Sequence, residues 1–403
     1  MRVLVIGGSL GGLFAANILH RIGCEVRVCE RVPGTLAGRG AGLATHPEMF
    51  EALRRSGVTS ELDVGVRTPG RVTVGRDGSI VGRHDLPQVL TSWGRLQNLL
   101  TAALPVGCYR GGKELRTIEQ DGDAVHAGFA DGTRLSAELL VGADGLRSTT
   151  RSLLAPETTS RYAGYVAWRG LVEEAQLSRY VRETIFDYLA FCLIPGEQML
   201  GYPVAGADDS LAVGKRRYNF VWYRPADEAT TLRRLLTDDA GRHRPEGIPP
   251  HLVSRAVIAQ MRADAERLLA PQFAEVTKLA AQPFLQPIMD FASDRLAYGR
   301  VVLLGDAAFV ARPHVGMGVT KAGGDAMALA DALTAHPTDL RRALQAYEAE
   351  RLPVGRFIVE HARKLGAPLT PLHRTEAERA LAQTNAAPEF VMRTAAVVPT
   401  LPW

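Results

Sequence analysis

The chain has 403 residues, of which 46% are hydrophobic and 22% are charged, a composition typical of globular proteins. This length predicts two or three domains, with room for a buried cofactor. The formal net charge is only +4, and the basic side chains are spread along the sequence. We therefore expect no nucleic-acid partner.

The cysteines and the first residues indicate the cellular compartment. Cys24, Cys29, Cys108 and Cys192 form no CxxC pair and no metal-ligand spacing, which favours free thiols in a reducing environment. The first apolar run, 3–6, is too short for a signal peptide or a membrane span. The ten histidines form no zinc-binding pattern. We expect a cytoplasmic protein that uses neither a metal ion nor a membrane.

The first thirty residues predict a βαβ unit. Residues 2–6 have the pattern of a buried strand, 11–22 that of a helix and 25–30 that of a second strand. Between the first strand and the helix lies Gly7-Gly8-Ser9-Leu10-Gly11-Gly12. Backbone N–H groups at such a turn bind a pyrophosphate, and an acidic residue such as Glu30 accepts hydrogen bonds from a ribose. The pattern predicts a dinucleotide site, although Ser9 replaces the usual middle glycine.

The middle of the chain predicts hairpins and a second sheet. Residues 71–142 contain short strands with Asp-Gly turns at 77–78, 121–122 and 131–132, and a helix near 94–103 interrupts them. The strand-rich region 161–290 predicts a separate antiparallel sheet with a helical insertion around 248–268. A buried strand at 300–304 follows, then helices at about 317–335 and 339–365. The Ala- and Pro-rich last thirty residues predict no element.

Two further motifs follow predicted core strands. They are Val141-Gly142-Ala143-Asp144-Gly145-Leu146-Arg147-Ser148, and Gly305-Asp306-Ala307-Ala308 with Arg312-Pro313-His314 and Gly316-Met317-Gly318 after it. An Asp at the carboxyl end of a parallel strand stands where ligands bind in open α/β sheets. The glycines at 316 and 318 expose a helix N-terminus, which stabilises an anion. An Asp-Gly pair alone is more often only a turn.

The three motifs, in this order and at these separations, resemble the flavoprotein aromatic hydroxylases typified by p-hydroxybenzoate hydroxylase. The resemblance covers nearly the whole chain. Within that family, the stretches Tyr162–Gly170, Tyr218–Tyr223 and Gly305–His314 are most similar to the 2,6-dihydroxypyridine 3-hydroxylase branch. The implied fold is α/β: a Rossmann-like FAD-binding domain, an antiparallel-sheet substrate domain and C-terminal helices.

The resemblance also implies domain limits. The FAD-binding domain would comprise 1–70, 94–160 and 291–335. The substrate domain would comprise 71–93 and 161–290, and a C-terminal helical segment would comprise 336–403. The long helix at 339–365 is a candidate interface for a homodimer.

The cofactor that the resemblance implies is FAD. Asp306 would hold the ribityl chain, Asp144 and Gly145 would lie near the pyrophosphate, and the helix after Gly318 would face the flavin pyrimidine edge. The expected FAD contacts are Gly7, Ser9, Leu10, Gly11, Gly12, Glu30, Arg31, Arg39, Arg95, Asp144, Gly145, Asp306, Pro313, Gly316, Gly318 and Val319. Two positions depart from the family pattern: Phe309 replaces a common His, and Thr320 replaces a common Asn.

The implied reaction is the hydroxylation of a small hydroxylated ring, a dihydroxypyridine or a phenol, through a flavin C4a-hydroperoxide. The co-substrates would be O2 and NADH or NADPH, and the branch similarity favours NADH. His314 is the candidate catalytic residue, because its loop joins Asp306 to the flavin-facing helix. His46, Tyr202 and Tyr218 are candidates for the substrate pocket, although aromatic residues on strands are more often core than catalytic.

Other interpretations explain less of the sequence. A flavin halogenase would carry a Trp-x-Trp-x-Ile-Pro signature, but this chain has Trp168-Arg169-Gly170. A plain NAD dehydrogenase would explain the first motif and Glu30 only. A non-catalytic dinucleotide-binding protein would need no flavin, and a colourless purified protein would favour it.

Overall fold

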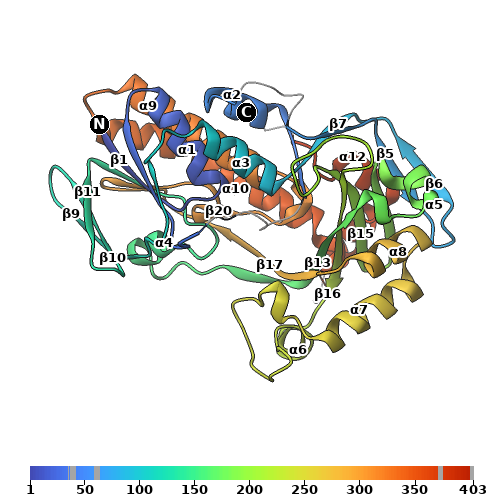
Figure 1. Ribbon diagram of the computed structural model, residues 1–403. Coiled ribbons are helices and arrows are strands. Elements are labelled where there is room, and N and C mark those ends of the chain that lie inside the picture. Colours follow the sequence, from blue (N-terminus) through green and yellow to red (C-terminus); the bar gives the residue numbers. More distant parts are fainter. Residues whose placement is uncertain (35, 37–41, 59–63, 371–374, 400–403) are drawn as a thin grey trace.

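The computed structural model describes residues 1–34, 36, 42–58, 64–370 and 375–399 (Figure 1). One half of the molecule is built on a six-stranded sheet with the order β18-β19-β12-β1-β2-β8. These strands are β1 (Arg2–Ile6), β2 (Glu25–Cys29), β8 (Tyr109–Arg110), β12 (Leu139–Gly142), β18 (Ala297–Tyr298) and β19 (Val301–Leu303). β1 pairs in parallel with β2 and β12, and β12 with β19. The apolar runs suit a parallel sheet that is covered on both faces.

Helices cover one face of this sheet and a small sheet covers the other. The helices are α1 (Leu10–Arg21), α2 (Pro47–Arg55), α3 (Trp93–Ala103), α9 (Gly318–Ala335) and α10 (Leu340–Leu365). The small sheet comprises β9 (Leu115–Gln120), β10 (Val125–Phe129) and β11 (Arg134–Ala137), and α4 (Thr149–Leu154) contacts β9. The predicted βαβ unit and the hairpins at 121–122 and 131–132 are confirmed.

The other half of the molecule is built on an eight-stranded sheet with the order β20-β17-β13-β16-β15-β14-β5-β6. Its strands are β5 (Arg71–Val74), β6 (Ile80–His84), β13 (Arg161–Glu173), β14 (Leu189–Ile194), β15 (Glu197–Val204), β16 (Arg217–Pro225), β17 (Phe284–Ala292) and β20 (Phe309–Val310). All pairs are antiparallel except β14 with β5. A three-stranded sheet of β3 (Gly42–Ala44), β7 (Gln88–Ser92) and β4 (Val66–Thr68) adjoins β15 through β7.

The two faces of the eight-stranded sheet pack against different residues. On one face lie α7 (Arg255–Leu268) and α8 (Pro271–Leu279), which share a hydrophobic core with Tyr218, Phe220 and Trp222 of β16. The alternate residues Val221 and Tyr223 belong to a separate cluster on the other face. Because side chains alternate along a strand, odd and even positions of β16 are buried in different places.

The last thirty residues contain two helices within the expected C-terminal helical segment, although the sequence pattern does not locate them. These are α11 (Glu376–Asn385) and α12 (Pro388–Thr394), and α12 packs on β5 and β6 (Figure 1). The short helices elsewhere are η1 (Glu174–Gln176), α5 (Arg179–Val181), η2 (Arg182–Phe186), η3 (Glu228–Leu232), α6 (Arg233–Leu235), η4 (Pro250–Leu252), η5 (Gly305–Ala307), η6 (Pro313–Val315) and η7 (Ala367–Leu369). None of the described helices combines the length and the apolar character that crossing a membrane requires. The three-part division of the chain stays a prediction.

Candidate active site

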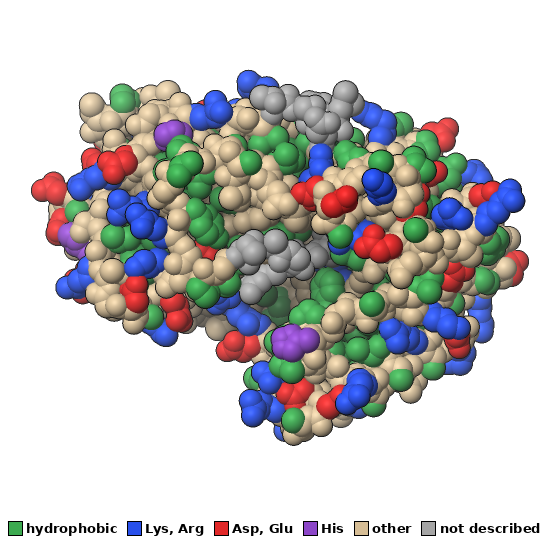
Figure 2. Space-filling model, viewed as in Figure 1, with side chains coloured by type: hydrophobic (Ala, Val, Ile, Leu, Met, Phe, Trp, Pro, Cys, Tyr) green, Lys and Arg blue, Asp and Glu red, His purple; other side chains and the backbone are tan. Residues whose placement is uncertain are grey.

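A cavity of about 560 Å³ extends from the six-stranded sheet to the eight-stranded sheet. At one end it is lined by the turns after β1, β2, β12 and β19, and at the other by residues of β13, β15 and β16. On the face shown in Figure 2, acidic and basic side chains are interspersed and the surface is hollowed between the two halves of the molecule. The cavity has the size of a cofactor site.

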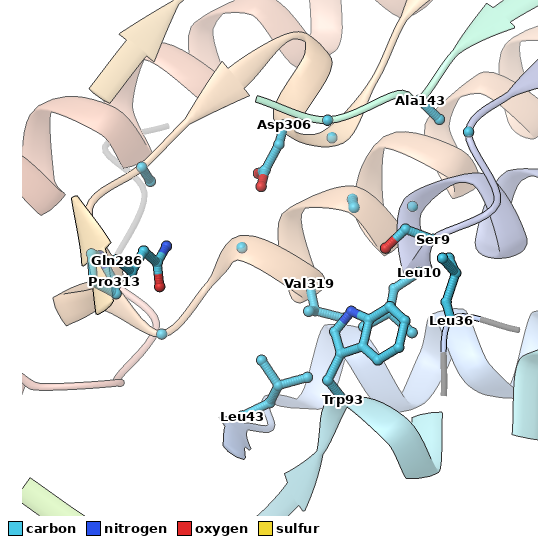
Figure 3. A pocket seen from close by; sticks show the side chains of 18 of the residues that line it. Ser9, Leu10, Leu36, Leu43, Trp93, Ala143, Gln286, Asp306, Pro313 and Val319 are labelled. Atoms are coloured by element: carbon cyan, nitrogen blue, oxygen red, sulfur yellow. The ribbon is translucent and has the colours of Figure 1, made fainter. Parts of the chain in front are cut away.

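The glycine-rich turn after β1 brings the N-terminus of α1 to the cavity. Gly7 has a φ of +105°, and a Cβ there would collide with the carbonyl oxygen of Ala143. A Cβ on Gly12 would collide with the carbonyl oxygen of Gly7. Ser9 is the N-cap of α1, but its side chain makes no cap hydrogen bond and points toward the cavity (Figure 3). The first N–H groups of α1 are therefore available to an anion.

Glu30 lies beside this turn and is 7% exposed. Its Oε2 accepts a hydrogen bond from the backbone N–H of Gly8 at 2.8 Å, and its Oε1 accepts one from Val32 at 2.9 Å. Each carboxylate oxygen still has a lone pair for a ligand hydroxyl group. The next residue, Arg31, is exposed and also lines the cavity.

Asp144 and Gly145 follow β12 at the cavity wall. The Asp144 carboxylate accepts hydrogen bonds from the Ser148 hydroxyl at 2.5 Å and from the Thr150 backbone N–H at 2.9 Å. These bonds hold the start of α4. Burial raises the pKa of Asp144, and the hydrogen bonds oppose that rise. Gly145 has a φ of +80°, which a residue with a Cβ rarely adopts.

Asp306 follows β19, and its side chain, 50% exposed, points into the cavity (Figure 3). The ammonium group of Lys321, on α9, lies 3.7 Å from Oδ1 of Asp306 and is fully buried. Among the described residues, Nζ of Lys321 has no hydrogen-bond partner. Desolvation raises the pKa of Asp306, whereas Lys321 lowers it. A ligand that contacts Asp306 would thus lie next to a buried positive charge.

The N-terminus of α9 also faces the cavity. Pro313, Gly316, Gly318 and Val319 line it, and the N-cap residue Met317 makes no side-chain cap hydrogen bond. Gly316 has a φ of +67°. The positive end of the helix dipole is therefore directed at whatever occupies this region.

His314 lies between two tyrosines at the far end of the cavity. Its Nε2 is hydrogen-bonded to the Tyr165 hydroxyl at 2.8 Å, and its ring centroid is 4.4 Å from that of Tyr223. Burial, with the nearby Arg312 guanidinium, lowers the pKa of His314 to about 3. The imidazole is therefore neutral at pH 7, and within the described part of the chain its Nδ1 has no partner.

Arg169 is a cation at this end of the cavity. Its Nη1 donates to Oε1 of Gln286 at 3.0 Å, and its Nη2 donates to the Gly42 carbonyl at 3.4 Å. No carboxylate of the described residues forms an ion pair with it. Burial raises the pKa of Tyr202 to about 12 and also raises that of Tyr223, so both hydroxyls stay protonated.

The structure brings most of the predicted site residues to one cavity. The lining includes Gly7, Ser9, Leu10, Gly11, Glu30, Arg31, Asp144, Gly145, Tyr202, Asp306, Pro313, His314, Gly316, Gly318 and Val319. Gly12 lies behind the turn, where it packs against Gly7. Arg39 lies outside the described residues.

Three further predicted residues do not reach the cavity wall. Tyr218 is wrong as a pocket residue, because it packs on Phe186 in the core on the opposite face of the sheet. His46 is turned toward the Thr320 hydroxyl, to which its Nδ1 is bonded at 2.8 Å. Arg95 donates from Nη1 to the Asp209 carbonyl at 2.6 Å.

Sequence reasoning missed several lining residues, among them Trp93, Arg169, Gln198, Tyr223 and Gln286. Trp93 lies in the lower right of the pocket view, between Leu43 and Leu10 and beside Val319 (Figure 3). For Tyr223 a signal existed, because it is five residues from Tyr218 and so belongs to the other face of the strand. Arg169 lies in the stretch Tyr162–Gly170, which resembles the family, whereas Trp93, Gln198 and Gln286 lie in none of the motifs.

Comparisons with known proteins agree with this geometry. Residues 2–67 match the family described as "Pyridine nucleotide-disulphide oxidoreductase", and 162–290 match "FAD binding domain-like". The chain is 33% identical over 372 residues to 2,6-dihydroxypyridine 3-monooxygenase of Paenarthrobacter nicotinovorans, with 91% of each chain covered.

Solved structures of related proteins also match this fold over most of the chain. The 2,6-dihydroxypyridine-3-hydroxylase of Arthrobacter nicotinovorans matches with a TM-score of 0.84 and 30% identity, covering 94% of this chain and 95% of that one. Klebsiella pneumoniae HpxO in complex with FAD and uric acid matches with a TM-score of 0.74 and 24% identity, covering 98% and 95%, and so supports the fold alone.

Proposed function

Because this chain belongs to the FAD-dependent aromatic monooxygenases, we propose that it hydroxylates a small ring that already carries hydroxyl groups, with a dihydroxypyridine as the first candidate. NADH or NADPH would be the reductant, and O2 the oxidant. The observation that carries the proposal is that one continuous cavity joins the glycine turn and Asp306 to a pocket of tyrosines, Arg169 and His314.

The residues of the cavity fit FAD. Both the uncapped N-terminus of α1 and the glycines around it suit a pyrophosphate, and Glu30 suits a ribose. Asp306 would accept hydrogen bonds from the ribityl hydroxyls, with Lys321 behind it. The N-terminus of α9 would stabilise negative charge on the flavin ring. Bound FAD would supply the electron transfer from the nicotinamide and the activation of O2.

The residues at the far end of the cavity would bind and orient the ring. Arg169 has no neutralising carboxylate among the described residues, so it would favour a substrate that has lost a hydroxyl proton. Tyr202 and Tyr223 stay protonated and can donate hydrogen bonds. With its low pKa, His314 is a weak base, so we propose that it orients a hydroxyl group by hydrogen bonding. Apolar lining such as Leu200 and Val221 would exclude water.

Three finer proposals accompany this function. We propose NADH as the reductant, because of the similarity to the dihydroxypyridine branch. All four cysteines are free thiols, which supports a cytoplasmic location. The long helix α10 is the candidate interface of a homodimer, and light scattering that finds a monomer would exclude it.

The experiment that tests the proposal is NADH oxidation by the purified flavoprotein in air, with a panel of hydroxylated pyridines and phenols. We expect 2,6-dihydroxypyridine to stimulate the oxidation at least tenfold and to gain one oxygen atom by mass spectrometry. Replacing NADH by NADPH tests the choice of reductant. The proposed function would be contradicted if no ring of the panel gave a hydroxylated product, even where a ring stimulated NADH oxidation.

A further inference from the structure

The C-terminal wall, which we define as residues 387–397, covers part of the cavity. Its helix α12 packs on β5 and β6, and Ala395 and Ala396 after the helix line the cavity. Ala395 also lines a second, smaller cavity of about 50 Å³, which shares His314 and Gln198 with the first. The wall thus lies beside the part of the site where a substrate ring would bind.

A buried arginine holds this wall. Arg71 on β5 is 1% exposed, and its Nη1 donates to the carbonyl oxygens of Met392 at 2.7 Å and Ala395 at 2.6 Å. Its Nη2 donates to Oε1 of Gln88 at 3.1 Å. Burial lowers the pKa of Arg71 to about 10, so it stays charged at pH 7. No carboxylate of the described residues pairs with it, so the carbonyls at the end of α12 are its principal acceptors.

A second set of bonds fixes the backbone of Ala396. This residue has a φ of +54°; its N–H donates to the His314 carbonyl at 2.8 Å. Its carbonyl oxygen is bonded to Nε2 of Gln88 at 3.0 Å and to Nε2 of His46 at 3.1 Å. His46 therefore carries its proton on Nε2, and its Nδ1 accepts from the Thr320 hydroxyl. The wall is tied to the loop of His314 and to the first turn of α9.

We propose that the C-terminal wall determines which rings fit the substrate cavity, and that Arg71 is the positioning residue that holds the wall closed against water. The identity of the ring rests on the proposed function, whereas the position of the wall does not. A displaced wall would let water reach the flavin. Reduced flavin would then lose its electrons without product, by NADH + H⁺ + O2 → NAD⁺ + H2O2.

The variant Arg71→Met removes the charge and keeps much of the volume. We expect hydrogen exchange in 388–397 to accelerate at least tenfold, iodide quenching of bound FAD to rise about twofold, and the fraction of NADH that yields H2O2 to increase severalfold. The Kd for FAD should stay within about twofold. Arg71→Lys should restore part of the protection of 388–397 from hydrogen exchange and of FAD from iodide, because lysine also donates hydrogen bonds to carbonyl oxygens.

Arg262→Met is the matched control. Arg262 donates to the Ala280 carbonyl at 2.8 Å, just after α8, on the opposite face of the sheet from the cavity. We expect none of the three readouts to change in it. Unchanged exchange and quenching in Arg71→Met, or equal changes in Arg262→Met, would overturn the role of Arg71.

A second substitution tests the wall itself. Ala395→Leu keeps Arg71 and should raise the KM for the ring about tenfold, with little change in kcat or in FAD binding, because it occupies substrate space. Equal KM values for Ala395→Leu and the unmodified protein would overturn the selectivity proposal. If no ring is hydroxylated, the proposed function fails, but exchange and quenching still decide the position of the wall.

Discussion

The pair formed by Asp306 and Lys321 shows how single residues prepare the site. Asp306 lies in the short helix η5 just after the core strand β19 and presents its carboxylate to the cavity, while the fully buried Lys321 ammonium lies 3.7 Å from it. A buried cation without a hydrogen-bond acceptor is costly unless an anion lies nearby. The positive charge of Lys321 therefore favours the ionised form of Asp306, against the desolvation that raises the pKa of this carboxyl group.

Replacing Lys321 by Met should weaken FAD binding. The charge that opposes the raised pKa of Asp306 would be lost, so the carboxylate would accept ligand hydrogen bonds less well. We expect the Kd for FAD to rise about tenfold, equivalent to about 1.4 kcal/mol. Fluorescence titration of the apoprotein with FAD measures this. Lys278→Met on the surface is the control, and an unchanged Kd in Lys321→Met would argue against the pair.

His46 should make the stability of the protein depend on pH. Burial lowers its pKa from 6.5 to about 4, so the unfolded chain binds a proton more readily than the folded one. This contribution to stability is fully present above pH 6.5 and is lost as the pH falls toward 4. Urea unfolding at pH 7 and pH 4.5 should show that His46→Gln removes about 2–3 kcal/mol of the pH dependence. If the free energy of unfolding changed with pH equally in the unmodified protein and in His46→Gln, His46 would not be a source of the pH dependence.

At the scale of elements, strand β16 shows what the sequence can and cannot predict. The pattern of 218–223 predicts the strand correctly. It does not reveal which face lines the cavity, because aromatic residues stand on both faces: Tyr218 in the α7–α8 core and Tyr223 at the site. A sheet that is buried on both sides loses the polar alternation that would identify its faces.

The two tyrosines of β16 should respond differently to loss of the hydroxyl group. Among the described residues the Tyr218 hydroxyl has no hydrogen-bond partner, so Tyr218→Phe should leave the free energy of unfolding unchanged or raise it by up to about 1 kcal/mol. Tyr223→Phe should weaken binding of the ring about three- to tenfold. Titrations that follow the flavin absorbance measure binding. If Tyr218→Phe weakened binding of the ring and Tyr223→Phe did not, Tyr218 rather than Tyr223 would be the residue of the substrate pocket.

For the whole molecule, the cofactor end was the predictable part. The glycine turn, Asp144 and Asp306 all follow parallel strands, whose carboxyl ends meet at one edge of a sheet. The C-terminal wall was not predictable. Its alanine-rich sequence has no periodicity, and its position depends on Arg71, more than 300 residues earlier in the chain. Contacts of that range leave no local signal.

We propose that one cavity of this protein holds FAD and a hydroxylated ring for the transfer of one oxygen atom from O2. The most direct measurement is turnover with 2,6-dihydroxypyridine and NADH under ¹⁸O2, with mass spectrometry of the product. We predict that one ¹⁸O atom enters the ring for each product molecule, and that none enters from H2¹⁸O. A product labelled from water, or NADH oxidation that yields only H2O2 with every ring tested, would contradict the account.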